Sequence, residues 1–165
     1  MIEAIEGSAY AVWVRESPSF FAYTWILSLH AMGLAIIVGI NTIVALRLLG
    51  WAPEIRINSL RKLFPWMYLG FTINAFSGLS LLAANASNDL HNWMFFVKLS
   101  MIALAMVNLE LTKAKVFNDP VVVNNTGVPP GVKRFAIASL AFWSVAIVAG
   151  RLTEYPAFVQ AWFGF

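Results

Sequence analysis

Long apolar runs without a charged side chain dominate the chain. Residues 17–46 and residues 63–88 contain no Asp, Glu, Lys or Arg, and about twenty apolar residues are enough to cross the hydrocarbon core of a bilayer. Backbone groups in lipid must be paired within their own segment, and the runs lack the alternation of a strand, so we expect helices. With two further apolar runs, the pattern predicts four membrane-spanning helices, over about residues 20–46, 64–86, 92–111 and 135–153.

The N-terminal segment has a different pattern. Residues 1–14 mix apolar side chains with Glu3 and Glu6, and they lack the basic region and the apolar core of a signal peptide. We predict a short amphipathic helix that lies in the membrane interface. Ser17 and Pro18 are then expected to supply the cap and the first-turn proline of the first span.

Composition agrees with a chain that is dissolved in lipid. Of the residues, 60% are hydrophobic and 12% are charged, whereas average soluble domains have about 25% charged residues. This excludes a disordered chain, an ordinary cytosolic enzyme and a nucleic-acid binder. The absence of cysteine excludes disulfides and metal clusters on Cys ligands. The predicted fold class is all-α: a single polytopic membrane domain over residues 1–165, a four-transmembrane-helix bundle with a short N-terminal interfacial helix.

The Lys and Arg residues are concentrated on one side of this predicted bundle. Eight of the eleven lie between the first and second spans or between the third and fourth: Arg47, Arg56, Arg61, Lys62, Lys113, Lys115, Lys133 and Arg134. Short loops that are rich in Lys and Arg stay in the cytoplasm. We therefore expect both termini and the short loop at residues 87–92 to face outward.

Three ionisable residues are expected at membrane depth, on three different helices and near the same side. His30 lies roughly 13–15 Å below the outer surface at a rise of 1.5 Å per residue, while Lys98 and Arg151 lie nearer to that surface. Such residues are costly in lipid and usually functional. A purely structural interpretation stays open, in which Lys98 and Arg151 extend to the headgroups and a neutral His30 donates to a carbonyl of the next helix.

These residues favour a haem site. An imidazole such as that of His30 is a good axial ligand for haem iron, and Lys98 and Arg151 lie at a depth suited to the propionates. Gly33, one turn after His30, is expected to leave room for the flat porphyrin, although small residues also serve helix packing. The second axial ligand stays open between Lys98, the other histidine His91, and water.

Several short motifs are spread over residues 18–155, namely Ser28-Leu29-His30-Ala31-Met32-Gly33-Leu34-Ala35, Leu46-Arg47-Leu48-Leu49-Gly50, Leu63-Phe64-Pro65-Trp66, Phe95-Phe96-Val97-Lys98-Leu99 and Ala149-Gly150-Arg151-Leu152. Together they resemble a family of small bacterial four-helix inner-membrane proteins of largely unknown function. More distantly, the chain is similar to HemJ-type protoporphyrinogen oxidases and to the membrane domain of CopD copper-resistance proteins. In the HemJ type, a histidine of the first helix and a lysine of the third carry function and haem association, and His30 and Lys98 match those positions.

The resemblance implies a multi-pass protein of the bacterial inner membrane, and the distribution of Lys and Arg then predicts that both termini lie in the periplasm. We expect a b-type haem protein that transfers electrons, as a subunit or partner of a larger membrane complex or with a periplasmic redox partner. Two alternatives stay open: a cofactor-free structural or anchoring subunit, and a HemJ-like porphyrinogen oxidase. Whether the protein is an enzyme is therefore undecided. The expected partners are the lipid bilayer and other membrane subunits, and we expect no binding to nucleic acid.

Overall fold

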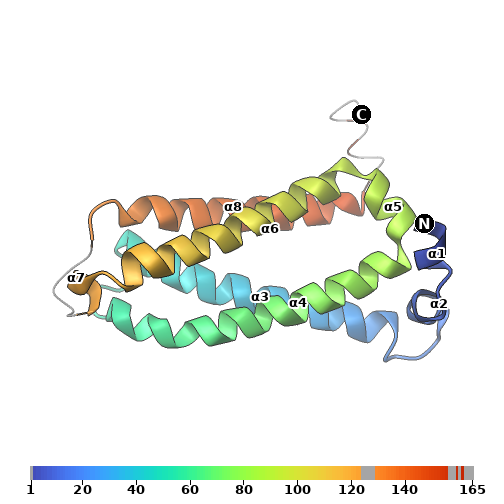
Figure 1. The fold of residues 1–165 in the computed structure, drawn as a ribbon, viewed down its shortest axis with the longest axis horizontal. Helices are drawn as coiled ribbons and strands as arrows, with labels where there is room; N and C mark the ends of the chain where they lie inside the picture. The colour runs from blue at the N-terminus through green and yellow to red at the C-terminus, as the bar shows by residue number, and fades with distance from the viewer. Residues whose placement is uncertain (1, 124–128, 156–158, 160, 162–165) are drawn as a thin grey trace.

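Four long helices run side by side along the length of the molecule, and short helices lie at both ends (Figure 1). The computed structural model describes residues 2–123, 129–155, 159 and 161. The long helices are α3 (Tyr23–Leu49), α4 (Phe64–Ala84), α6 (Trp93–Thr112) and α8 (Val132–Thr153). Each belongs to a segment that is long and apolar enough to cross a membrane, so the predicted all-α bundle is confirmed.

Both ends of α3 have local causes. Gly50 adopts a left-handed conformation with φ of 109°, and its N–H donates to the carbonyls of Arg47 and Leu46, which is a common way for a helix to end. The prediction that Ser17 caps this helix is wrong, because α3 begins only at Tyr23. Pro18 disfavours the helical conformation for the residue before it, and Ser17 is extended and ends the preceding helix instead.

The N-terminal segment forms two helices rather than the single one predicted for residues 1–14. These are α1 (Ile2–Glu6) and α2 (Ala9–Glu16), and Met1 lies outside the described residues. The chain turns between them, and the Ser8 hydroxyl accepts a hydrogen bond from the N–H of Ala11 at the start of α2. Since a side-chain cap favours a new helix start, Ser8 divides the segment.

The N-terminal helices are fastened to the end of α4 and to α5 (Ala86–His91). The Glu6 carboxylate accepts hydrogen bonds from the N–H of Ser87 at 2.7 Å and from its hydroxyl at 2.6 Å. Arg15 donates to the carbonyl of Ala84 at 3.2 Å. We call this end of the bundle, with α1, α2 and α5, the α5 end.

The opposite end carries three short helices and most of the cationic side chains. These helices are η1 (Ile57–Leu63), η2 (Lys113–Phe117) and α7 (Pro120–Val123), and they contact one another. We call it the η1 end. The Lys and Arg residues of the two predicted cytoplasmic connections therefore gather at one end of the bundle, as their sequence positions require.

Packing is uneven along the bundle. Helix α3 packs on α4, α6 packs on α8, and contacts between α3 and α8 join the two pairs. One large apolar core, which includes Ile37, Leu48 and Phe117, fills the middle and the η1 end. Toward the α5 end it gives way to two separate small clusters: Val14, Ile26 and Ala84 on one side, and Met94, Ala149 and Val159 on the other. The helix pairs therefore separate toward this end.

Candidate functional site

A cavity of about 450 Å³ lies between the two helix pairs in the half of the bundle toward the α5 end. Its volume falls within the range of roughly 300–1,000 Å³ that is typical of ligand and cofactor sites. All four long helices contribute apolar side chains to its walls, among them Leu34, Leu81, Ile102 and Trp143. The polar lining residues are His30, Asn74, Asp89, Lys98, Arg151, Thr153 and Glu154. Apolar walls with a few convergent polar groups are what a binding site requires.

The imidazole of His30 is held in one orientation by α4. Its Nδ1 lies 3.1 Å from the carbonyl oxygen of Asn74 and 3.2 Å from the hydroxyl oxygen of Ser77. A carbonyl can only accept, so Nδ1 carries the proton and Nε2 is left with a free lone pair. Nε2 has no hydrogen-bond partner among the described residues. A histidine that binds a metal is usually oriented in this way, by a hydrogen bond from its other nitrogen.

Helices α3 and α4 approach each other closely beside this imidazole. The side-chain amide of Asn74 donates to the backbone carbonyl of His30 at 2.9 Å, so the two residues bond reciprocally. A Cβ atom added at Gly33 would lie 2.7 Å from the Asn74 nitrogen and 2.8 Å from the Gly70 oxygen. The expectation that Gly33 leaves room for a porphyrin therefore does not match the geometry. Its missing side chain lets the backbones of α3 and α4 meet.

The side chain of Lys98 reaches the same cavity from α6. A Cβ atom added at Gly150 would lie 3.3 Å from its Cδ, so the absence of a side chain at Gly150 gives the lysine its place. The ammonium group lies within electrostatic range of His30 and of the carboxylates of Asp89 and Glu154. His30 and Lys98 are thus brought to one cavity from helices that are distant in sequence.

Arg151 lines the cavity from α8, at its α5 end. Its Nη2 donates to the Tyr155 hydroxyl at 2.8 Å, and its guanidinium lies 4.9 Å from the centre of that ring. Arg151 is exposed. The structure therefore brings together the three residues predicted to share one depth, His30, Lys98 and Arg151.

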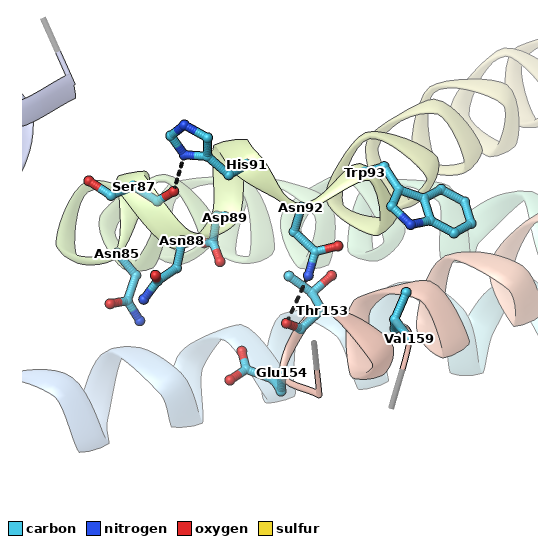
Figure 2. A pocket seen from close by; sticks show the side chains of 10 residues that line it. All are labelled: Asn85, Ser87, Asn88, Asp89, His91, Asn92, Trp93, Thr153, Glu154 and Val159. Carbon is cyan, nitrogen blue, oxygen red and sulfur yellow. Dashed lines mark hydrogen bonds between the residues drawn. The ribbon is translucent and has the colours of Figure 1, made fainter. Parts of the chain in front are cut away.

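His91, in contrast, does not line this cavity. It ends α5, is exposed, and places its Nδ1 2.5 Å from the carbonyl oxygen of Ser87. Figure 2 shows its ring pointing away from Asp89 and Glu154, which lie on the side of α5 that faces α8. His91 lines the surface depression at the α5 end rather than the cavity of His30, so the structure does not support it as a second ligand in the same cavity.

Two carboxylates were not assigned to the site from the sequence. Asp89 comes from α5 and Glu154 from the end of α8, and both line the cavity at its α5 end. Burial raises the pKa of Asp89, the nearby Glu154 raises it further, and Lys98 opposes both effects. The sequence signal for Asp89 was a single acid in a loop without cations, and only the folding of that loop as α5, against α6 and the end of α4, brings it to the cavity.

The geometry gives one oriented imidazole in a largely apolar cavity whose charged groups all lie toward one end. Such a site can hold an amphipathic cofactor or ligand by its apolar body and can coordinate a metal through Nε2 of His30. In comparisons with known proteins, no family model, no curated protein and no solved structure matches the chain.

Proposed function

We propose that the cavity binds haem b through Nε2 of His30 and that the protein transfers electrons as a subunit or partner of a larger membrane complex. The observation that carries the proposal is the hydrogen bonding of this imidazole. Its Nδ1–H is held by the carbonyl of Asn74, while Nε2 is free of partners in the described part of the chain. Bundles of four helices commonly build cofactor sites from inward-facing side chains.

The other lining residues fit the parts of this cofactor. The apolar side chains from the two helix pairs suit a flat macrocycle, and Lys98 and Arg151 offer cations to its two carboxylates at the α5 end. Asp89 and Glu154 lie within electrostatic range of Lys98, so they reduce the positive charge that a bound propionate would meet at that side chain. Haem supplies one-electron chemistry when bound. The chain's own part is to orient the imidazole and to exclude water from the apolar floor.

The second axial position is open to two candidates. A deprotonated Lys98 amine can ligate iron from the cavity wall, or a water molecule can occupy the position. Lys98→Met retains much of the length and apolar volume of the side chain but removes the nitrogen. If the amine is the ligand, this variant converts a low-spin spectrum into a high-spin one, whereas a water ligand leaves the spin state unchanged.

Visible spectroscopy of the purified protein tests haem binding. Protein from cells supplied with a haem precursor is expected to show a Soret band that shifts on reduction with dithionite. His30→Ala removes the imidazole and should abolish the band. His91→Ala is the matched control. It removes the other histidine of the sequence, which does not line the cavity, so the band should persist. A colourless wild-type protein, or equal haem content in both variants, would contradict the proposal.

A second candidate is a cofactor-free anchoring subunit, which the reciprocal bonds between His30 and Asn74 favour. In that case His30 pairs two helices, and its role ends there. His30→Gln, whose amide can still donate to the Asn74 carbonyl, should then preserve stability and assembly with the partner complex. Under the haem proposal the same variant remains folded but loses the Soret band, so the two functions separate.

A third candidate is oxidation of a porphyrinogen, as the resemblance to the HemJ type implies. The supporting observation is that His30 and Lys98, the two positions that match that type, line one cavity. Complementation of a bacterial strain that lacks protoporphyrinogen oxidase tests it. Growth with the wild-type chain and its loss with Lys98→Met would favour the enzyme. Failure to grow, with haem present in the protein, favours electron transfer.

We also propose that the protein lies in the bacterial inner membrane with the η1 end in the cytoplasm and both termini in the periplasm. The cations of the two connections at the η1 end support this orientation. Because the chain has no cysteine, single cysteines can report it. In intact cells, a reagent that cannot cross the inner membrane should label Asn88→Cys at the α5 end and spare Glu54→Cys. The reverse pattern would refute the orientation.

A further inference from the structure

We infer that the cavity is filled from the aqueous side at the α5 end, through a polar portal formed by Asp89, Thr153 and Glu154. The portal would admit an amphipathic molecule whose apolar body passes inward while its polar groups stay at the mouth. The inference concerns the cavity proposed to hold haem, and it deepens that proposal by naming the route of entry. Its test does not require haem.

The first support is a depression of about 740 Å³ on the surface of the α5 end. Its lining is mostly polar, and Figure 2 shows Asn88 and Asp89 of α5, with Asn85 just before it, pointing toward the side where Glu154 follows the end of α8. The side-chain amide of Asn92 donates to the Thr153 carbonyl at 3.1 Å and so holds α6 to α8 beside it. The depression is therefore a built feature between α5, α6 and α8.

The second support is that the depression and the cavity share part of their lining. Asp89, Thr153 and Glu154 line both. A side chain that borders two neighbouring spaces lies where they adjoin, so these three residues mark the passage from the surface to the cavity. Beyond them, the lining becomes apolar around Ile102 and Trp143.

The third support is the charge at this passage. Neither carboxylate, of Asp89 or of Glu154, accepts a side-chain hydrogen bond or forms an ion pair within the described ranges. Lys98 and Arg151 lie at the same end of the cavity. Charged groups without direct partners are costly unless water reaches them, which favours a mouth that is open to water. Two cations and two anions also make it nearly neutral overall, which suits a polar group of either sign.

The competing route is sideways from the lipid. Leu27 and Ile147 line the cavity and are 45% and 41% exposed, so an apolar molecule could pass between them. A ligand with charged groups would have to carry these groups through hydrocarbon on that route, at a high cost in desolvation. The polar mouth avoids this cost, and we therefore favour aqueous entry.

Cysteine labelling distinguishes the two routes, since these 165 residues include no cysteine. Ala146→Cys places a thiol on the cavity wall, and Ala105→Cys is the control, because Ala105 is buried in the main core and does not line the cavity. Haem-free protein in nanodiscs is treated with a charged methanethiosulfonate that does not enter lipid. The cavity thiol should react about tenfold faster or more, because the core thiol reacts only after local opening of the fold.

Two further variants test the portal itself. Thr153→Trp fills the passage and should slow labelling of Ala146→Cys by the charged reagent, while a small lipid-soluble maleimide still reacts. The pair Asp89→Asn and Glu154→Gln should lower the ratio of the rates for cationic and anionic reagents. If Ala146→Cys does not fold, Leu82→Cys repeats the test from the α4 wall.

The outcomes separate this inference from the haem proposal. Rapid labelling that Thr153→Trp blocks supports the portal, and it does so even if the purified protein proves colourless. Reaction with the lipid-soluble reagent alone, unaffected by Thr153→Trp, overturns the portal in favour of lateral entry, even if haem is bound. Equal rates for the cavity and core thiols also overturn it, because no hydrated path would then reach the cavity.

Discussion

Replacing Gly33 by alanine should specifically disrupt the contact that orients His30. The added methyl group would lie 2.7 Å from the backbone nitrogen of Asn74, whereas ordinary contacts begin at 3.4 Å. These neighbours are backbone atoms of α4, which cannot rotate away as a side chain can. Helices α3 and α4 must therefore separate by about 0.7 Å at this crossing, and the bonds between His30 and Asn74 must lengthen.

The loss in free energy of unfolding caused by Gly33→Ala can be estimated from typical values. Overpacking typically costs about 1–3 kcal/mol, and each hydrogen bond between membrane helices contributes about 0.6 kcal/mol on average. The better helix propensity of alanine returns up to about 1 kcal/mol. With two such hydrogen bonds between His30 and Asn74, we expect Gly33→Ala to lower the free energy of unfolding by about 1–4 kcal/mol, and to lower haem content if the cofactor is bound.

Gly39 in the same helix is the matched control, because an added Cβ atom there meets nothing within 4 Å. Gly39→Ala should be neutral or stabilising by up to about 1 kcal/mol. Both variants can be unfolded by SDS in mixed micelles and followed by circular dichroism. If their stabilities agree within about 0.5 kcal/mol, which is the usual scatter of harmless substitutions, the close helix contact does not exist in the membrane.

Two further predictions concern the ends and the interior of the bundle. Hydrogen bonds from Ser87 lower the pKa of Glu6, so this carboxylate should stabilise the fold above the ordinary glutamate pKa of about 4.3 and lose its effect as pH falls through the lowered value. In thermal melts, Glu6→Gln should be less stable than the wild type at pH 7, and the difference should shrink as pH falls below the ordinary glutamate range; a difference that does not change with pH would exclude this link. Asn41 accepts a hydrogen bond from Ser139 at 2.8 Å, but its buried Nδ2 has no partner among the described residues. Asn41→Leu removes this unpaired donor together with the hydrogen bond, and the two effects offset each other. The variant should therefore change the free energy of unfolding, measured by SDS titration, by less than about 1 kcal/mol. A loss above about 2 kcal/mol would mean that Nδ2 is paired in the membrane.

The spans could be predicted because their cause is local. A helix that crosses lipid needs its own apolar length and pairs its own backbone, so charge-free runs such as residues 17–46 locate it without knowledge of its neighbours. Boundaries were less certain where short-range chemistry competed. Pro18 kept Ser17 extended, and Ser8 started a second N-terminal helix, so the predicted cap and the predicted single helix were both wrong.

The sequence also indicated that His30, Lys98 and Arg151 lie toward one end, because depth along a helix follows from residue number. It could not show which way each side chain faces, since that depends on which helices pair. Only the tertiary structure placed the Asn74 carbonyl against Nδ1 of His30, used Gly33 for the contact between α3 and α4, and turned His91 away from the cavity.

Asp89 shows the same division most clearly. Its position in the sequence marks a short loop at the end of the bundle, and nothing local connects it with His30. The loop folds as α5, and the separation of the two helix pairs then opens the cavity that Asp89 borders. Hydrophobic length along the chain thus determined what crosses the membrane, whereas the packing of helices distant in sequence decided where the cavity lies and which polar groups face it.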